Sequence, residues 1–318
     1  MKEGIPRISA LVITYKQEDL IGRTLDSLLK QKDFLYEICV SDDCSPDNTW
    51  KVLLEYQKRY PELIKLHRNE PNVGIFENFE QVWTMPTGDI IYQVSGDDEC
   101  GEGWLKRVVD CVQEEGIDFK NDLFCIYGNF KCSYPNGDYY VFHNSAIIKY
   151  PDHALRLALR GLVCNRSACF SKNVLKKFDK VSQGRSHVVE MMQDALLQLY
   201  TEKNYYLDGI GNIYYANIGV SAHLDEETLK VRQQIRPFAE NFLRSKGITI
   251  RKTDKYFGKY QRALIMFRFH HGTVNLLKAL WYYILSFDLR YSFLGDNTKR
   301  YAFAILRRLP HKKPICFK

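Results

Sequence analysis

The sequence predicts an α/β fold, with a parallel sheet that has helices on both faces. Short apolar stretches alternate with amphipathic stretches through the first half of the chain, and the connections between them are short. Residues 7–15 are apolar on both faces, which is typical of a strand buried inside a parallel sheet. Residues 18–30 then place their leucines on one stripe, as a helix covering such a sheet does.

The elements expected in the first half follow this alternation. Strands are expected at residues 7–15, 36–41, 63–66 and 90–94, and helices at 18–30, from 50 to about 61, at 76–83 and at 104–114. The second half departs from strict alternation, so a mixed sheet is expected there. Its expected elements are strands at 123–130, 139–142 and 168–171, a helix at 187–202, and two closing strands between 204 and 218.

The composition is typical of a folded cytosolic protein. Apolar residues make up 45% of the 318 residues and aromatic residues 14%, which excludes a disordered chain. The nine cysteines are odd in number and include no CxxC pair, so we expect reduced thiols and no zinc site. The first residues lead directly into the first strand, so no signal peptide is expected.

Polar pairs stand where three of the expected parallel strands end. These pairs are Thr14 with Tyr15, Asp42 with Asp43, and Asp97 with Asp98. Ligands of open parallel sheets bind beyond the carboxyl ends of the strands, so one crevice is expected to collect all three pairs. Adjacent carboxylates repel one another, and a divalent cation such as Mg²⁺ or Mn²⁺ would neutralise them. The alternative is a strand exit with solvated acids.

Phosphate-binding glycine loops are missing from the sequence. Neither GxGxxG after the first strand nor GxxxxGK[ST] occurs, so a phosphate would be held by a metal or by side chains. Further candidates come later in the chain. Asp194 lies four residues after Glu190 and shares its helical face, so it faces either a cleft or solvent. His223 is either a metal ligand or an ordinary surface residue.

The carboxyl-terminal tail carries the positive charge of the protein. Residues 251–318 contain 15 Lys and Arg against 3 Asp and Glu, whereas the remainder contains 30 against 35. Aromatic and aliphatic residues recur there at helical spacing, and the apolar stretch 274–287 is too short to span a bilayer. Such basic amphipathic helices suit an anionic membrane surface. The alternatives are a helical extension packed on the domain and nucleic acid, for which no binding module is visible.

Taken in order, these motifs resemble the family 2 glycosyltransferases, which have the GT-A nucleotide-sugar-binding fold. The resemblance covers about residues 6–223. It is carried by Val12-Ile13-Thr14-Tyr15, by Ser41-Asp42-Asp43 with the turn to Thr49, by Asn72-Val73-Gly74, by Asn78-Phe79-Glu80, by Gly88-Asp89 through Asp97-Asp98, and by the helix with Asp194. It implies a GT-A-like nucleotide-sugar-binding mixed sheet flanked by helices in residues 1–224, with residues 225–318 as a helical extension.

The resemblance also implies roles for individual residues. Residues that match the nucleotide-sugar site are Thr14, Tyr15, Asp42, Asp43, Asn72, Gly74 and Asp97. Asp97 and Asp98 match the acidic metal motif, with His223 as a candidate third ligand, and Asp194 matches the catalytic base. Three positions depart from the common pattern: Ser95 stands for the first acid of the metal motif, Lys16 for an asparagine, and Gln193 for the acid before the base.

The expected protein is an inverting, metal-dependent glycosyltransferase that uses Mn²⁺ or Mg²⁺. Its donor would be a nucleotide-diphosphate sugar, with UDP as the default nucleotide and a dTDP-deoxysugar as an alternative. Its acceptor would be a hydroxyl of a lipid-linked or cell-surface glycan at the cytoplasmic face of the cell membrane. Two alternatives are a sugar-phosphate nucleotidyltransferase and a non-catalytic membrane-associated scaffold with a degraded nucleotide-sugar site.

Overall fold

A computed structural model of the chain describes residues 4–145, 148, 167–177, 197, 199–216, 218, 240–241, 244–245, 247–270, 272–286, 314 and 316–317. The described strands form one sheet in the order β10-β7-β6-β8-β4-β1-β2-β3; β9 joins it by pairing with β6, and β5 pairs with β9. Their bounds are β1 Ile8–Thr14, β2 Leu35–Asp42, β3 Ile64–Arg68, β4 Ile90–Ser95, β5 Glu99–Cys100, β6 Phe124–Ser133, β7 Tyr139–Phe142, β8 Cys169–Ser171, β9 Lys203–Tyr215 and β10 Cys316–Phe317.

Strands β1 to β4 form the expected parallel part of the sheet. β1 lies between β2 and β4 and pairs with both in parallel, and β2 pairs with β3 in the same direction. Every residue of β1 is buried, which explains why its sequence is apolar on both faces. The register places Thr14 opposite Asp42, and Ile13 opposite Ser95, so these three strands end at the same edge.

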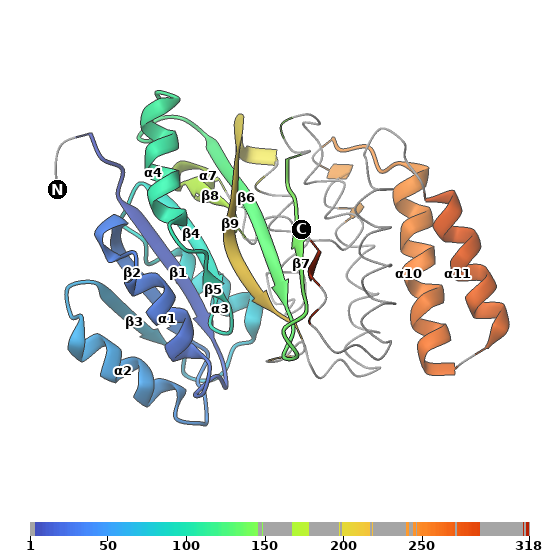
Figure 1. The fold of residues 1–318 in the computed structure, drawn as a ribbon, viewed down its shortest axis with the longest axis horizontal. Coiled ribbons are helices and arrows are strands. Elements are labelled where there is room, and N and C mark those ends of the chain that lie inside the picture. Colours follow the sequence, from blue (N-terminus) through green and yellow to red (C-terminus); the bar gives the residue numbers. More distant parts are fainter. Residues whose placement is uncertain are drawn as a thin grey trace.

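Helices cover both faces of this parallel part (Figure 1). Their bounds are α1 Ile21–Leu29, α2 Thr49–Arg59, α3 Ile75–Trp83, α4 Trp104–Glu114 and α7 Lys172–Leu175. Alternate residues of β1 serve the two faces: Ala10 and Val12 pack in the core with α1, α2 and α4, whereas Leu11 and Ile13 pack in the core with α3 and α7. The two-sided core therefore holds the strand ends in fixed positions.

The second half of the sheet is mixed, as expected. β8 pairs antiparallel with β4 and β6, and β7 pairs antiparallel with β6. The prediction of two strands between residues 204 and 218 was wrong, because β9 is a single strand that runs parallel to β6 and also pairs with β5. The glycines of β9 resemble those of a turn in the sequence, but in the structure they allow close packing. A Cβ on Gly211 would lie 2.6 Å from the Cβ of Ser167.

Two long helices form most of the described part of the tail. α10 spans Lys252–His270 and α11 spans Thr273–Leu285, and they pack on one another at the end of the molecule opposite β3 (Figure 1). The last strand, β10, returns to pair with β7. Among the residues that the structure describes, no helix combines the length and apolar composition needed to cross a bilayer. Residue 224, the expected domain boundary, lies outside the described residues, so that division stays a prediction.

Candidate active site

The ends of β1 and β4 are held together by a close backbone contact. Thr14 is buried, and its Oγ1 lies 2.7 Å from Oε1 of Gln17. The N–H of Gly96 donates to the carbonyl of Ile13 at 2.9 Å. A Cβ on Gly96 would lie 3.0 Å from Cβ and Oγ1 of Thr14 and 2.3 Å from Oε1 of Gln17, so a larger residue here would force these side chains to shift.

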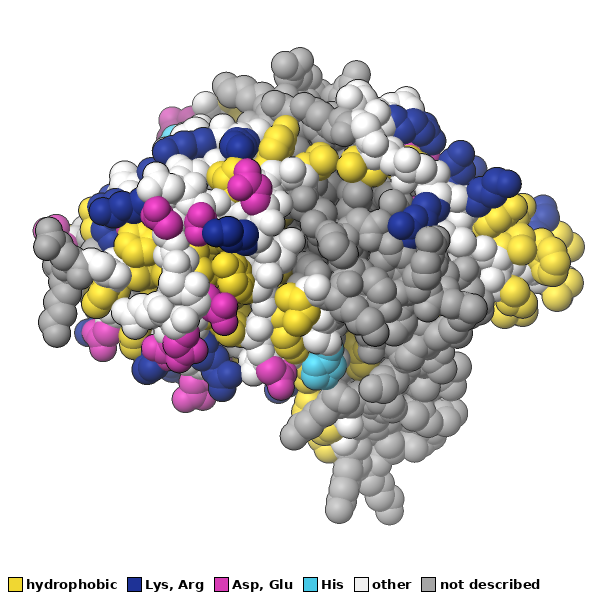
Figure 2. All heavy atoms as spheres, turned by 90° about the horizontal axis from the view of Figure 1, so that it is seen from above, with side chains coloured by type: hydrophobic (Ala, Val, Ile, Leu, Met, Phe, Trp, Pro, Cys, Tyr) yellow, Lys and Arg dark blue, Asp and Glu magenta, His cyan; other side chains and the backbone are white. Residues whose placement is uncertain are grey.

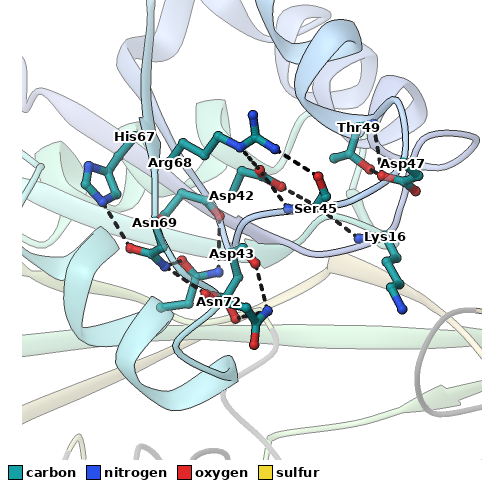
Figure 3. Close-up of polar contacts among 12 residues, drawn as sticks. Lys16, Asp42, Asp43, Ser45, Asp47, Thr49, His67, Arg68, Asn69 and Asn72 are labelled. Carbon is teal, nitrogen blue, oxygen red and sulfur yellow. Dashed lines mark hydrogen bonds and ion pairs between the residues drawn. The ribbon is translucent and has the colours of Figure 1, made fainter.

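Asp42 ends β2 as a fully buried carboxylate (Figure 3). It accepts hydrogen bonds from the hydroxyl and the backbone N–H of Ser45, and its Oδ2 lies 3.3 Å from Nε of Arg68. Burial raises the pKa of Asp42 above its usual value, although the Ser45 hydrogen bonds and the Arg68 charge act in the opposite direction. The carboxylate therefore fixes the turn after β2 and retains an uncompensated cost of burial.

Asp43 organises the loop before α3. Its Oδ1 accepts from the side-chain amide of Asn69 at 3.0 Å and from the N–H of Val73 at 2.9 Å. Its Oδ2 accepts from the side-chain amide of Asn72 at 2.8 Å and from the N–H of Gly74 at 2.9 Å. These four donors occupy the usual acceptor positions of a carboxylate. The structure thus brings Asp43, Asn72 and Gly74 together and links them directly.

Asn69 and Asn78 complete this network and were missed by the sequence analysis as site residues. The side-chain amide of Asn69 donates to both Asp43 and Oδ1 of Asn78, and its Oδ1 lies 3.0 Å from Nε2 of His67 (Figure 3). Asn78 is buried and donates to the carbonyl of Ser41 at 3.2 Å. The available sequence signal was the pair of asparagines at Asn69, directly after β3, and at Asn78 in α3; their burial in the structure shows why each needs specific partners.

Tyr15 and Lys16 form the exit of β1. Tyr15 is half-buried, and Nζ of Lys16 lies 5.2 Å from the centre of its ring. The backbone of Lys16 has a φ of 54°, and its N–H donates to Oγ of Ser45. Asparagine adopts this left-handed conformation more readily than lysine, which gives a physical reason for the asparagine expected here.

The acidic turn with Asp97 and Asp98 is held by its backbone. Nη2 of Arg23 donates to the carbonyl of Asp97 at 2.6 Å, and the hydroxyl of Thr24 donates to the carbonyl of Asp98 at 2.7 Å. The side chain of Asp98 is buried, and its Oδ1 accepts the N–H of Tyr215 at 3.3 Å. Helix α1 and strand β9 therefore fix the turn from two sides.

Buried polar residues of α1 and its exit extend this support beyond the acids. Oγ of Ser27 accepts the N–H of Cys100 at 2.9 Å. The side chain of Gln31 donates to the carbonyl of Gly101 at 3.0 Å and accepts the N–H of Leu105 at 3.0 Å. Thr24, Ser27 and Gln31 recur at helical spacing beside the apolar stripe of α1, and this recurrence is the sequence signal for the support they give.

The turn continues into a pairing between β5 and β9. Glu99 lies 3.3 Å from Nε of Arg23 and accepts the hydroxyl of Tyr215 at 2.7 Å. The guanidinium of Arg23 lies 3.7 Å from the centre of the Tyr215 ring. Burial, together with the hydrogen bond to Glu99, raises the pKa of Tyr215 to about 12. Tyr215 is therefore a neutral hydrogen-bond donor beside the acidic turn.

The donor atoms of the acidic turn suit a hard divalent cation. Asp97 and Asp98 supply carboxylate oxygens, and such cations commonly take two carboxylates and complete their shell with substrate oxygens and water. In the described part of the chain, no group of three or more His, Cys, Asp and Glu side chains could hold a metal by itself. Asp194 and His223 lie outside the described residues, so their roles stay predictions.

Comparisons with known proteins agree with this architecture. Residues 9–176 match the model of the family described as Glycosyl transferase family 2. The dTDP-rhamnosyl transferase RfbG of Shigella flexneri is 25% identical over 198 residues, which cover 62% of this chain and 50% of that one. The processive diacylglycerol beta-glycosyltransferase of Mycoplasma pneumoniae is 32% identical over 113 residues, 35% of this chain and 33% of that one. The chain spans between 18% and 50% of the length of these and other curated relatives.

A solved structure shares the fold. The crystal structure of S. aureus TarS 1-349 in complex with UDP-GlcNAc superposes with a TM-score of 0.54 at 20% sequence identity, covering 83% of this chain and 73% of that chain. This likeness confirms the expected mixed α/β sheet flanked by helices of the GT-A type. The family match covers more than half of the chain and includes the strand-end acids described above. The chain belongs to glycosyl transferase family 2.

Proposed function

We propose that this protein is an inverting, metal-dependent glycosyltransferase that transfers a sugar from a nucleotide-diphosphate donor to a hydroxyl of a glycan. One observation carries the proposal: the register of the parallel strands collects Thr14, Asp42 with its neighbour Asp43, and the start of the turn to Asp97 at one edge of the sheet. Nucleotide ligands bind at this edge in open parallel sheets.

The proposed roles of the residues follow from their side-chain chemistry. Thr14, Tyr15, Asp42, Asp43, Asn72 and Gly74 would line the nucleoside end of the donor. Asp97 and Asp98 would hold a Mn²⁺ or Mg²⁺ ion, with His223 as a candidate third ligand. When bound, the ion would stabilise negative charge on the diphosphate. Asp194 would take the proton of the acceptor hydroxyl from the face opposite the leaving group, which inverts the anomeric carbon.

The donor and acceptor classes follow the relatives. The TarS crystal structure is a complex with UDP-GlcNAc, and the Shigella relative is named for a dTDP-linked sugar, so UDP is the default nucleotide and dTDP the alternative. The Mycoplasma relative is named for a lipid acceptor. We propose a lipid-linked or cell-surface glycan as the acceptor, reached by peripheral association with the cytoplasmic face of the membrane.

Nucleotide-dependent stabilisation tests the proposal. Thermal unfolding is measured with UDP, GDP, dTDP or CDP, each with and without Mn²⁺, on the wild type and on Asp98→Asn. A ligand at 100 times its dissociation constant adds about 2.7 kcal/mol, which raises the melting temperature measurably. Asp110→Asn is the matched control, since Asp110 lies on the surface of α4 in an ion pair with Lys106.

The expected result is a metal-dependent shift with one nucleotide that Asp98→Asn loses and Asp110→Asn retains. The absence of any shift, with no turnover of nucleotide-sugars, would refute the proposal and favour a non-catalytic scaffold. Release of pyrophosphate from a nucleoside triphosphate and a sugar phosphate would instead identify a nucleotidyltransferase.

A further inference from the structure

The outer surface of α11 is apolar and exposed to solvent. Six large apolar side chains of this helix are exposed: Val274, Leu276, Leu277, Leu280, Trp281 and Ile284. Two of them, Leu277 and Trp281, are 65% and 60% exposed. At about 100° per residue, the six cover an arc of about 160° on one side of the helix. A soluble monomer rarely leaves such a continuous apolar face uncovered, so this face indicates an interaction site.

The opposite side of α11 is already used for packing against α10. Ala279 is buried in a cluster with Phe257 and Tyr260 of α10. The rings of Tyr260 and Tyr283 lie 5.1 Å apart, centre to centre, and those of Tyr256 and Tyr282 lie 6.4 Å apart. The helix pair is thus anchored by its inner side, and the exposed arc is not needed to hold the pair together.

A stripe of positive charge runs beside the apolar arc. Four exposed cations recur at helical spacing on α10: Lys252, Lys255, Lys259 and Arg262. Nζ of Lys259 lies 5.5 Å from the centre of the Tyr282 ring, which brings this basic stripe against α11. Around α11, exposed Lys278 lies between Tyr282 and the apolar arc, so cations and apolar side chains form one continuous surface.

The charge of this region is almost entirely positive. Residues 251–286 contain seven Lys and Arg and one acid, Asp254, whose side chain is buried. Figure 2 shows hydrophobic side chains gathered at the end of the molecule that bears α10 and α11, with Lys and Arg side chains beside them. Apolar and aromatic residues flanked by cations are typical of helices that lie in the interface of an anionic bilayer.

We propose that the apolar arc of α11 inserts into the surface of an anionic lipid bilayer while the basic stripe of α10 contacts the headgroups. This inference deepens the proposed membrane association by naming the surface that makes it. α11 has 13 residues and is about 20 Å long, so it lies along the membrane rather than across it. A symmetric dimer through the same face would bring two basic stripes together, and like charges disfavour it.

Vesicle flotation of the full chain tests this surface. The wild type is mixed with vesicles that contain phosphatidylglycerol or with vesicles of phosphatidylcholine alone, at low and at high salt. We expect binding to the anionic vesicles that salt weakens, and at least tenfold weaker partitioning for the double variant Leu277→Glu, Trp281→Glu. Leu54→Glu is the matched control, since Leu54 is an exposed leucine on α2.

The basic stripe is tested separately from the apolar arc. Lys255→Gln with Arg262→Gln should weaken anionic binding at least tenfold and leave the weak phosphatidylcholine binding unchanged. All variants change exposed side chains, so their melting temperatures should match that of the wild type. If the melting temperature of Leu277→Glu, Trp281→Glu falls, the double variant Leu277→Ala, Trp281→Ala takes its place.

Two results would overturn the proposal. One is a wild type that does not float with anionic vesicles, and the other is an α11 variant that floats as the wild type does. Self-association that Leu277→Glu, Trp281→Glu abolishes, without vesicle binding, would identify a second copy as the occupant instead. Nucleotide-dependent stabilisation is measured on the same samples and should be unchanged in the α11 variants. A protein that binds nucleotide but not vesicles would refute the membrane surface alone, whereas a protein that binds no nucleotide would refute the proposed function.

Discussion

Replacement of Asp43 by asparagine tests the loop network of the candidate site. Asparagine keeps the shape of the side chain but converts one acceptor oxygen into an NH₂ group. If the NH₂ group replaces Oδ2, it faces the donors of Asn72 and Gly74; if it replaces Oδ1, it faces those of Asn69 and Val73. In either orientation two donors lose their acceptor.

The expected loss of stability is that of the less costly orientation of the new asparagine amide. Asn72 is exposed and can turn toward water, so the loss of its hydrogen bond costs little. The backbone N–H of Gly74 is fixed at the start of α3 and cannot turn away. A hydrogen bond to a charged group contributes about 1.5–3 kcal/mol, and an unmade buried one costs about 1–3 kcal/mol. We therefore expect Asp43→Asn to lower the free energy of unfolding by about 2–4 kcal/mol.

Urea denaturation measures this loss, and nucleotide-dependent stabilisation is measured in parallel. Asp47→Asn is the control within the neighbouring loop, where Asp47 is less buried and accepts mainly from Thr49. We expect it to cost about 1 kcal/mol. If Asp43→Asn unfolds within about 0.5 kcal/mol of the wild type and loses only nucleotide binding, the carboxylate serves the ligand rather than the loop, and the reasoning above is wrong.

Three further changes test other parts of the structure. Hydrogen bonds hold the pKa of buried Glu37 at about 2 against its usual 4.5. The ionised side chain therefore contributes about 2–3 kcal/mol to the free energy of unfolding above pH 4.5, and this contribution is lost as the pH falls toward 2. The difference in stability between the wild type and Glu37→Gln, measured by urea denaturation, should close over that range. Gln31→Leu should lower the free energy of unfolding by about 2–3 kcal/mol, because it removes the partners of two buried backbone groups beside the acidic turn. It should also weaken nucleotide-dependent stabilisation, and unchanged nucleotide binding would refute the link between Gln31 and the acidic turn. Lys16→Asn should raise the melting temperature by relieving about 0.5–1 kcal/mol of backbone strain, and a lower one would contradict the conformational argument.

The parallel half of the fold was predictable because local pattern and tertiary structure agree there. The apolar strands, the amphipathic helices and the short connections each point to the same arrangement, and α4 begins and ends at the expected residues, Trp104 and Glu114. The edge at which Thr14, Asp42 and the turn after Ser95 meet followed from strand direction alone.

The sequence marks candidate polar residues but does not predict the contacts that shape the site, because these contacts depend on which buried polar atoms meet. Periodicity identified the apolar stripe of α1 but not the use of Thr24 and Gln31 to hold the backbone of the acidic turn and its exit. Glycines in a strand are likewise ambiguous in the sequence, because they can mark either a turn or a position of close packing. Trp104 is fully buried, and a Cβ on Gly128 or on Gly211 would lie 2.5 Å or 2.8 Å from its indole, so these glycines allow the indole to pack rather than end a strand.

The buried carboxylates Glu37 and Asp42, near opposite ends of β2, differ in how far the protein compensates their burial. At the amino-terminal edge, Glu37 accepts from Ser9 and Thr87 and pairs with Lys65, and these partners outweigh its burial and lower its pKa. At the carboxyl edge, burial outweighs the partners of Asp42, and the pKa of that carboxyl is raised. We therefore expect a cation or a hydrogen-bond donor that binds beside the turn after β2 to lower the pKa of the Asp42 carboxyl, whereas Glu37 already has its partners.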